Sequence, residues 1–68
     1  MNKIFGERLK ELRVENGLSC RELGRRIGVS GSSILRWEAG QNVILAELLV
    51  KLAKHFNVSM GYLFGAEE

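Results

Sequence analysis

The sequence has no proline and no aspartate, and its 68 residues include only one cysteine and one histidine. One cysteine cannot form the disulfide framework that small extracellular domains usually need, so we expect a reduced, cytoplasmic protein. Cys20 and His55 supply no metal-ligand set, and no nucleophile, base and acid arrangement is available without an aspartate. The sequence therefore predicts no metal, no cofactor, no small-molecule ligand and no enzymatic activity.

Long apolar runs are also missing. The densest run, residues 43–50, is interrupted by Glu47 and is far shorter than the ~20 residues that a membrane span needs. Charged residues near the N-terminus occupy the place where a secretory signal carries its apolar core. We therefore expect no membrane association. The length predicts one domain, residues 1–68, which is too short for a catalytic barrel or a nucleotide-binding sheet.

The net charge of +2 is small, but the charges are unevenly placed. Residues 1–40 carry eight basic and five acidic side chains, whereas residues 41–68 carry two and three. A basic N-terminal part suits a polyanionic partner such as DNA, and a solvated charged face would produce the same asymmetry.

Glycines and capping serines divide the chain into five expected helices. A Ser19–Glu22 capping box opens the second helix, and Ser30 and Ser59 are expected to cap the third and the fifth. Apolar spacing from Leu45 to Phe56 marks the fourth as a core helix. The expected ranges, caps included, are residues 3–15, 19–27, 30–39, 45–56 and 59–64, with a frayed tail over 65–68. No alternating strand pattern occurs, so the predicted fold is an all-α, five-helix bundle.

The second and third helices, over about residues 19–39, have the form of a helix-turn-helix unit with a glycine-containing turn. Gly24 is small enough for the close helix crossing that this unit needs, Gly28 suits the turn, and Ile34 is expected to face inward. The segments GERLKELRVENGLSCREL, IGVSGSSILRWEAG and LAKHFNVSMGYLF resemble the lambda and 434 repressor and Cro family, also called XRE-type helix-turn-helix proteins. The resemblance extends from Ile4 to Gly65.

The resemblance implies that the third helix, residues 31–39, is a recognition helix in the DNA major groove. A projection at 100° per residue places Ile34 on one side and Ser32, Leu35 and Arg36 on the other, where we expect base readout. Arg36 is suited to guanine, and Leu35 to a thymine methyl group. A solvated or phosphate-bound Arg36 and a merely exposed Leu35 are the alternatives.

Residues expected at DNA phosphates follow from the same resemblance. They are Ser19, Cys20, Arg21, Gly31, Ser33, Gln41 and Asn42. The family usually has a glutamine where this chain has Cys20, and basic residues in the loop after the third helix, where this chain has uncharged ones. That loop can therefore offer backbone contacts but no charged ones. Of the three arginines in the second helix, Arg21 is favoured, and at least one of the others is expected to be solvated.

The resemblance also implies two structural roles. Glu38 is expected to form an ion pair with Arg13, which would hold the third helix against the first. Met60, Tyr62 and Phe64 recur at every second position of the last helix, so they cannot all point into the core. Relatives pair through this helix, and we expect a homodimer on a palindromic operator, with a monomer as the alternative.

Together these features predict a small prokaryotic or phage transcriptional regulator that binds double-stranded DNA sequence-specifically. The alternative is a protein-interaction module, for example one resembling an antitoxin, that keeps the helical bundle and has little affinity for DNA. The modest charge, Cys20 and Gly31 motivate this alternative. The sequence leaves open whether the protein represses, activates or serves as an antitoxin.

Overall fold

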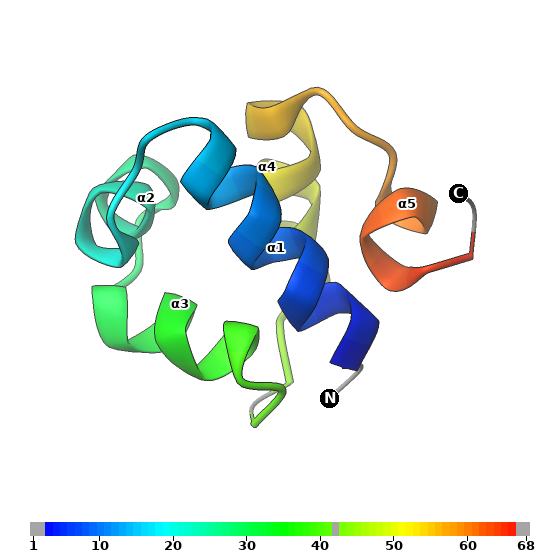
Figure 1. Cartoon of the computed structure of the whole chain (residues 1–68), viewed down its shortest axis with the longest axis horizontal. Helices are drawn as coiled ribbons and strands as arrows, with labels where there is room; N and C mark the ends of the chain where they lie inside the picture. Colours follow the sequence, from blue (N-terminus) through cyan, green and yellow to red (C-terminus); the bar gives the residue numbers. More distant parts are fainter. Residues whose placement is uncertain (1–2, 42, 67–68) are drawn as a thin grey trace.

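The computed structural model describes residues 3–41 and 43–66, and these residues form five helices and no strand (Figure 1). The helices are α1 (Lys3–Glu15), α2 (Cys20–Ile27), α3 (Gly31–Glu38), α4 (Ala46–Phe56) and α5 (Met60–Phe64). The predicted all-α fold is confirmed, and the helix bounds agree with the expected ranges to within about one residue. Within the described ranges, none of the helices has the length and apolar character needed to cross a membrane.

All five helices contribute to one hydrophobic core. α2 and α3 lie at one end of the molecule and α5 at the other, with α1 between them (Figure 1). The largest fully buried side chains come from every helix and are Phe5, Leu9, Leu23, Ile34, Leu52 and Leu63. Burial of a large apolar side chain stabilises the fold by about 1.5 to 3 kcal/mol, so this shared core determines how the helices are arranged.

The prediction that Leu45 belongs to the buried apolar face of α4 was wrong. Leu45 is 62% exposed because it is the N-cap residue, with an extended backbone, and precedes the helix. The inward face starts with Leu48, which is partly buried, and continues with the buried Leu49 and Leu52. Helical periodicity applies only to residues within the helix, and an apolar N-cap gives no local signal of where α4 begins.

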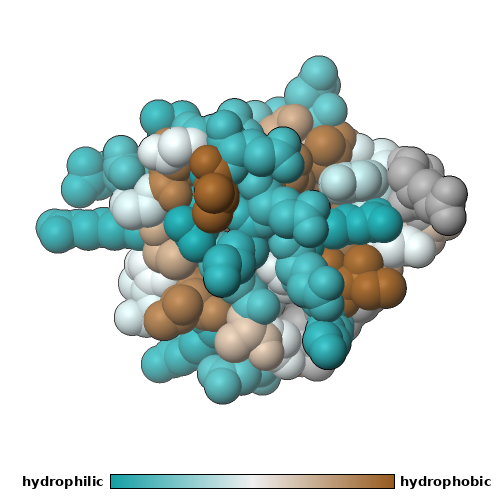
Figure 2. All heavy atoms as spheres, viewed as in Figure 1, coloured by the Kyte–Doolittle hydropathy of each residue, from teal (hydrophilic) through white to brown (hydrophobic). Residues whose placement is uncertain are grey.

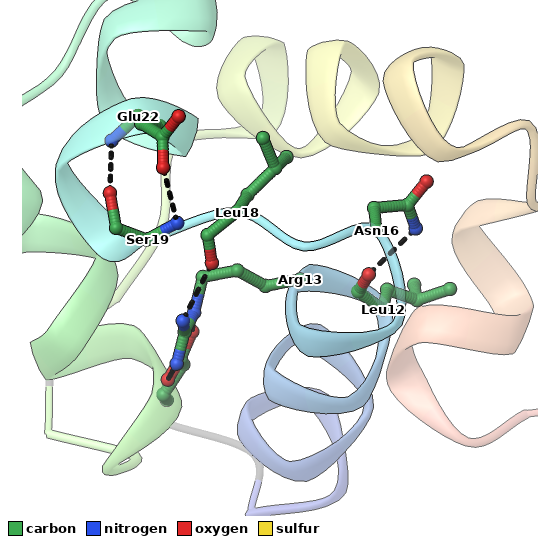
Figure 3. Close-up of polar contacts among 7 residues, drawn as sticks. Leu12, Arg13, Asn16, Leu18, Ser19 and Glu22 are labelled. Carbon is green, nitrogen blue, oxygen red and sulfur yellow. Dashed lines mark hydrogen bonds and ion pairs between the residues drawn. The ribbon is translucent and has the colours of Figure 1, made fainter.

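The serine caps form as the sequence predicts. The Ser19 hydroxyl accepts from the Glu22 N–H at 3.0 Å, and the Glu22 carboxylate accepts from the Ser19 N–H at 3.0 Å (Figure 3). Ser30 and Ser59 accept from the N–H groups three residues later, which satisfies donors that the first turn of a helix leaves unpaired. Gly28 ends α2 in the left-handed conformation, with φ of 86°.

Residues 65 and 66, the first part of the expected frayed tail, form backbone hydrogen bonds to the last turn of α5. Gly65 takes the left-handed conformation, and its N–H donates to the Tyr62 carbonyl at 3.1 Å. The Ala66 N–H donates to the Gly61 carbonyl at 2.8 Å. These bonds close the C-terminal end of α5 and satisfy its last carbonyls. Residues 67 and 68 lie outside the described residues.

Arg13 and Glu38 form the expected ion pair between α1 and the last turn of α3. The Arg13 Nε donates to Glu38 Oε2 at 2.6 Å, and Nη2 donates to Oε1 at 3.0 Å. The third guanidinium nitrogen, Nη1, donates to the Leu18 carbonyl at 2.9 Å (Figure 3). The side chains are 14% and 5% exposed, and the hydrogen bonds to Glu38 raise the pKa of Arg13 above its ordinary value.

We expect Glu38→Ala to lower the free energy of unfolding by about 3 kcal/mol, because removal of one partner leaves a mostly buried charge unpaired. Urea denaturation at neutral pH measures this loss. Glu11→Ala, an exposed carboxylate on α1, is the matched control and should change stability by less than about 0.5 kcal/mol. Equal stability of Glu38→Ala and the wild type would show that the pair contributes nothing.

The capping box makes stability depend on pH in the acid range. The Ser19 backbone N–H, and then its side chain, lower the pKa of Glu22 below the ordinary value of 4.5. The unfolded chain therefore binds the proton more readily, so the contribution of Glu22 is present above pH 4.5 and is lost as pH falls through the lower folded pKa. In urea titrations below pH 5, the stability of Glu22→Gln should fall less steeply than that of the wild type. Identical slopes would contradict this.

Candidate nucleic-acid interface

The crossing of α2 and the turn before α3 depends on Gly24. A Cβ atom at this position would lie 2.5 Å from the Val29 carbonyl oxygen and 3.0 Å from the Ser30 carbonyl. The Gly24 carbonyl in turn accepts from the N–H groups of Gly28 and Val29, each at 2.8 Å. Because backbone atoms surround Gly24 on this side, a side chain would force the turn outward. The angle at which α3 leaves the turn is therefore fixed by backbone contact.

The exposed face of α3 is the one expected to read bases. Ile34 and Trp37 are buried in the core, while Ser32, Leu35 and Arg36 are exposed to solvent. Leu35 is 61% exposed, although it is a large apolar residue on an otherwise polar face. The structure thus brings the three expected readout residues together on one helix face with no protein element over them in the described part of the chain.

The first turns of α2 and α3 lie against each other. A Cβ atom on Gly31 would lie 3.0 Å from both the N and Cα of Arg21, and 3.3 Å from the carbonyl carbon of Cys20. The sequence shows Gly31 only as a position without a long polar side chain, whereas the structure shows that the two backbones meet there. Two helix N-termini, each with a positive dipole end, are thereby placed side by side.

The remaining residues expected at DNA phosphates differ in which hydrogen-bond donors they still have available. The Ser33 N–H is already capped by Ser30, and the Ser33 hydroxyl lies 3.3 Å from the Ser30 hydroxyl. The Ser19 hydroxyl accepts within the capping box but keeps its own proton to donate. The Gln41 N–H donates to the Arg36 carbonyl at 3.0 Å, so only its exposed side chain is available. Asn42 lies outside the described residues.

The three expected dimer residues of α5 have different surroundings. The Arg8 guanidinium stacks over the Tyr62 ring, 4.3 Å from its centroid, and Arg8 Nη1 donates to the Tyr62 carbonyl oxygen. The Phe64 ring packs against that of Phe5, with 5.4 Å between centroids. Met60 is 39% exposed. Tyr62 and Phe64 therefore pack partly onto α1. Of the three expected dimer residues, Met60 has the side chain that is exposed to solvent.

The surface between these regions is mainly polar. Figure 2 shows hydrophilic side chains over most of the visible face, with apolar groups in small separate areas. One of these areas lies on the side where α5 is found (Figure 2). Ile4, at the start of α1, is exposed and lies next to Gly65, whose Cβ position would be 2.9 Å from an Ile4 methyl group. The ends of α1 and α5 thus share a small apolar surface.

Comparison with known proteins identifies this arrangement. Residues 9–63 match the family model described as helix-turn-helix. The chain belongs to the XRE-type helix-turn-helix family. A Pyrococcus furiosus protein named for an HTH-type transcriptional regulatory role is 38% identical over 55 residues. Those residues are 81% of this chain and only 18% of that protein, so the chain corresponds to a small part of its relative.

Two solved structures show the same XRE-type fold. The P22 c2 repressor, crystallised in complex with a synthetic operator, superposes with a TM-score of 0.88 and 29% identity, over 97% of this chain and all of that one. The restriction-modification controller protein C.AhdI from Aeromonas hydrophila gives a TM-score of 0.81 and 34% identity, over 91% and 94% of the two chains. These similarities confirm the lambda-repressor-like arrangement of the five helices.

Proposed function

We propose that this domain binds double-stranded DNA sequence-specifically in the cytoplasm as a transcriptional regulator, with α3 in the major groove of a palindromic operator. The observation that carries the proposal is the uncovered face of α3, which Gly24 and the Arg13–Glu38 pair hold in a fixed position. The likeness to a repressor crystallised with its operator supports it.

Base readout is assigned to the exposed face of α3. A guanidinium bonds guanine O6 and N7 together, so Arg36 selects guanine. Leu35 is suited to a thymine methyl group, because apolar contact in the groove removes its large exposed surface from water. The Ser32 hydroxyl is short and exposed near the start of the helix, where it reaches a base edge only if the helix end approaches closely.

Phosphate binding is assigned to the paired N-termini of α2 and α3 and to the loop after α3. Backbone N–H groups of a first helical turn and nearby side chains bind phosphate without reading sequence. The assigned residues are Ser19, Cys20, Arg21, Gly31, Ser33, Gln41 and Asn42. Their contacts fix the position of α3 in the groove, and their contribution to affinity falls as salt rises.

Dimerisation through α5 follows from the small size of the interface that one α3 offers. A single recognition helix makes too few base contacts to find one site among many, and a two-fold pair doubles them. Met60 is the exposed contact, and Tyr62 and Phe64 support it from partly buried positions. A two-fold pair places the half-sites about 34 to 36 Å apart, one turn of DNA.

A mobility-shift assay separates this function from a protein-interaction role. The protein is titrated into random-sequence duplex, and into a duplex selected from a randomised pool, at low and moderate salt. DNA binding predicts a shift that weakens as salt rises and a clear preference for the selected duplex. A protein-interaction module without DNA affinity would shift neither duplex at either salt concentration.

We expect Arg36→Ala to reduce the preference for the selected duplex, because it removes about 1 to 3 kcal/mol of discrimination at one base pair. Affinities are measured for the selected duplex and for variants changed at each position in turn. Lys54→Ala removes one positive charge from the exposed side of α4 and is the control. An unchanged ranking of duplexes with Arg36→Ala would remove Arg36 from base readout.

We expect Met60→Glu to convert a complex of two protein chains per operator into a complex of one, because a carboxylate at the contact opposes pairing. Sedimentation of protein with a saturated operator duplex gives the stoichiometry. Met60 is a better test position than Phe64, whose ring packs on Phe5 within the fold. Val14→Glu, at an exposed apolar residue of α1, is the control. One wild-type chain per saturated operator would contradict dimerisation.

A further inference from the structure

A hollow lies between α2 and the start of α3, beside the face that reads bases. It has a volume of about 540 Å³ and is open to solvent. Its lining residues are Arg21, Arg25, Val29, Ser30, Gly31 and Ser32. The lining contains two arginines and no carboxylate, and the N-terminal turn of α3 forms one wall. The hollow is therefore electrically positive, and it is accessible to a ligand from outside.

Arg21 and Arg25 are one helical turn apart, so their side chains project from the same face of α2. Both are exposed, and neither forms a hydrogen bond or an ion pair within the described residues. Like charges at this spacing destabilise a helix, and an anion placed between them removes that repulsion. The Ser19 hydrogen bonds lower the pKa of Glu22 most, and Arg26 and then Arg25 lower it further, but the Glu22 carboxylate accepts from the Ser19 N–H and forms no ion pair with Arg25 in the described residues.

The third arginine of α2 projects toward a different element. Arg26 Nη1 lies 3.3 Å from Nε2 of His55, near the C-terminal end of α4. The structure therefore separates Arg25 from Arg26, between which the sequence does not choose. Arg21 and Arg25 line the hollow, and Arg26 lies against α4.

The hollow also has a defined position relative to the proposed dimer. It lies at the start of α3, and Figure 1 shows this end of the molecule opposite α5. In a two-fold pair formed through α5, the two hollows are at the outer ends of the complex. DNA backbone that reaches a hollow therefore lies at or beyond the outer edge of each half-site.

We propose that Arg21 and Arg25 form a clamp for a backbone phosphate of the DNA that flanks the operator, outside the base pairs that α3 reads. Guanidinium groups bind phosphate oxygens in a planar, paired geometry, and two of them around one hollow match a single phosphate. The clamp rests on the proposed DNA-binding function. It adds Arg25 to the phosphate contacts, and it makes affinity depend on duplex length beyond the operator.

The test compares the wild type with Arg21→Ala, Arg25→Ala and Arg26→Ala on two duplexes that contain the same selected operator. One duplex has long flanks, and the other ends at the edges of the half-sites. On the long duplex, Arg21→Ala and Arg25→Ala should each weaken binding and lower the slope of log K against log salt by about 1, whereas Arg26→Ala should leave that slope unchanged. On the trimmed duplex, Arg25→Ala should bind as the wild type does.

Neutral methylphosphonate linkages in the flanks provide a second readout that does not depend on protein folding. Replacement of the outer phosphates should weaken the wild type more than it weakens Arg25→Ala, which keeps only Arg21 at the hollow. Equal binding of the wild type and Arg25→Ala on the long duplex overturns the clamp alone and leaves the proposed function standing. Failure of the wild type to bind any duplex overturns both.

Discussion

The guanidinium of Arg13 joins three segments of the chain. Two of its nitrogens donate to Glu38 at the end of α3, and the third donates to the Leu18 carbonyl just before α2. Both helices of the helix-turn-helix unit are thus tied to α1 through one side chain that is mostly buried. Such a charge is costly unless each donor has a partner, so the three segments are held in one arrangement.

Two glycines complete the positioning of α3. Gly24 lets the turn cross α2 at backbone contact, and Gly31 lets the first turn of α3 meet the first turn of α2. At the other end of the molecule, Arg8 holds α5 onto α1 through Tyr62. The proposed reading face on α3 and the proposed dimer contact on α5 are therefore both held in place by contacts with α1. This is the property that a two-fold DNA reader needs, because half-site spacing depends on their relative position.

Local sequence signals predicted the helices well, because capping serines, glycine stops and apolar spacing act over a few residues. They failed at Leu45, where an apolar N-cap continues the helical pattern. They also gave no sign of the backbone hydrogen bonds that join residues 65 and 66 to the last turn of α5. The Arg13–Glu38 pair was anticipated only through family resemblance. The contact between Arg8 and Tyr62 joins residues 54 positions apart and has no local signal.

An NMR titration of the amide groups of the isotope-labelled protein with a selected operator duplex tests most directly whether α3 enters the major groove. If it does, the largest shift changes fall at the first turn of α2 and along the exposed side of α3. Small changes are expected along the outer face of α1, apart from its contact with α5. Largest changes on α1 or α4, with α3 unaffected, would contradict the claim that α3 enters the major groove.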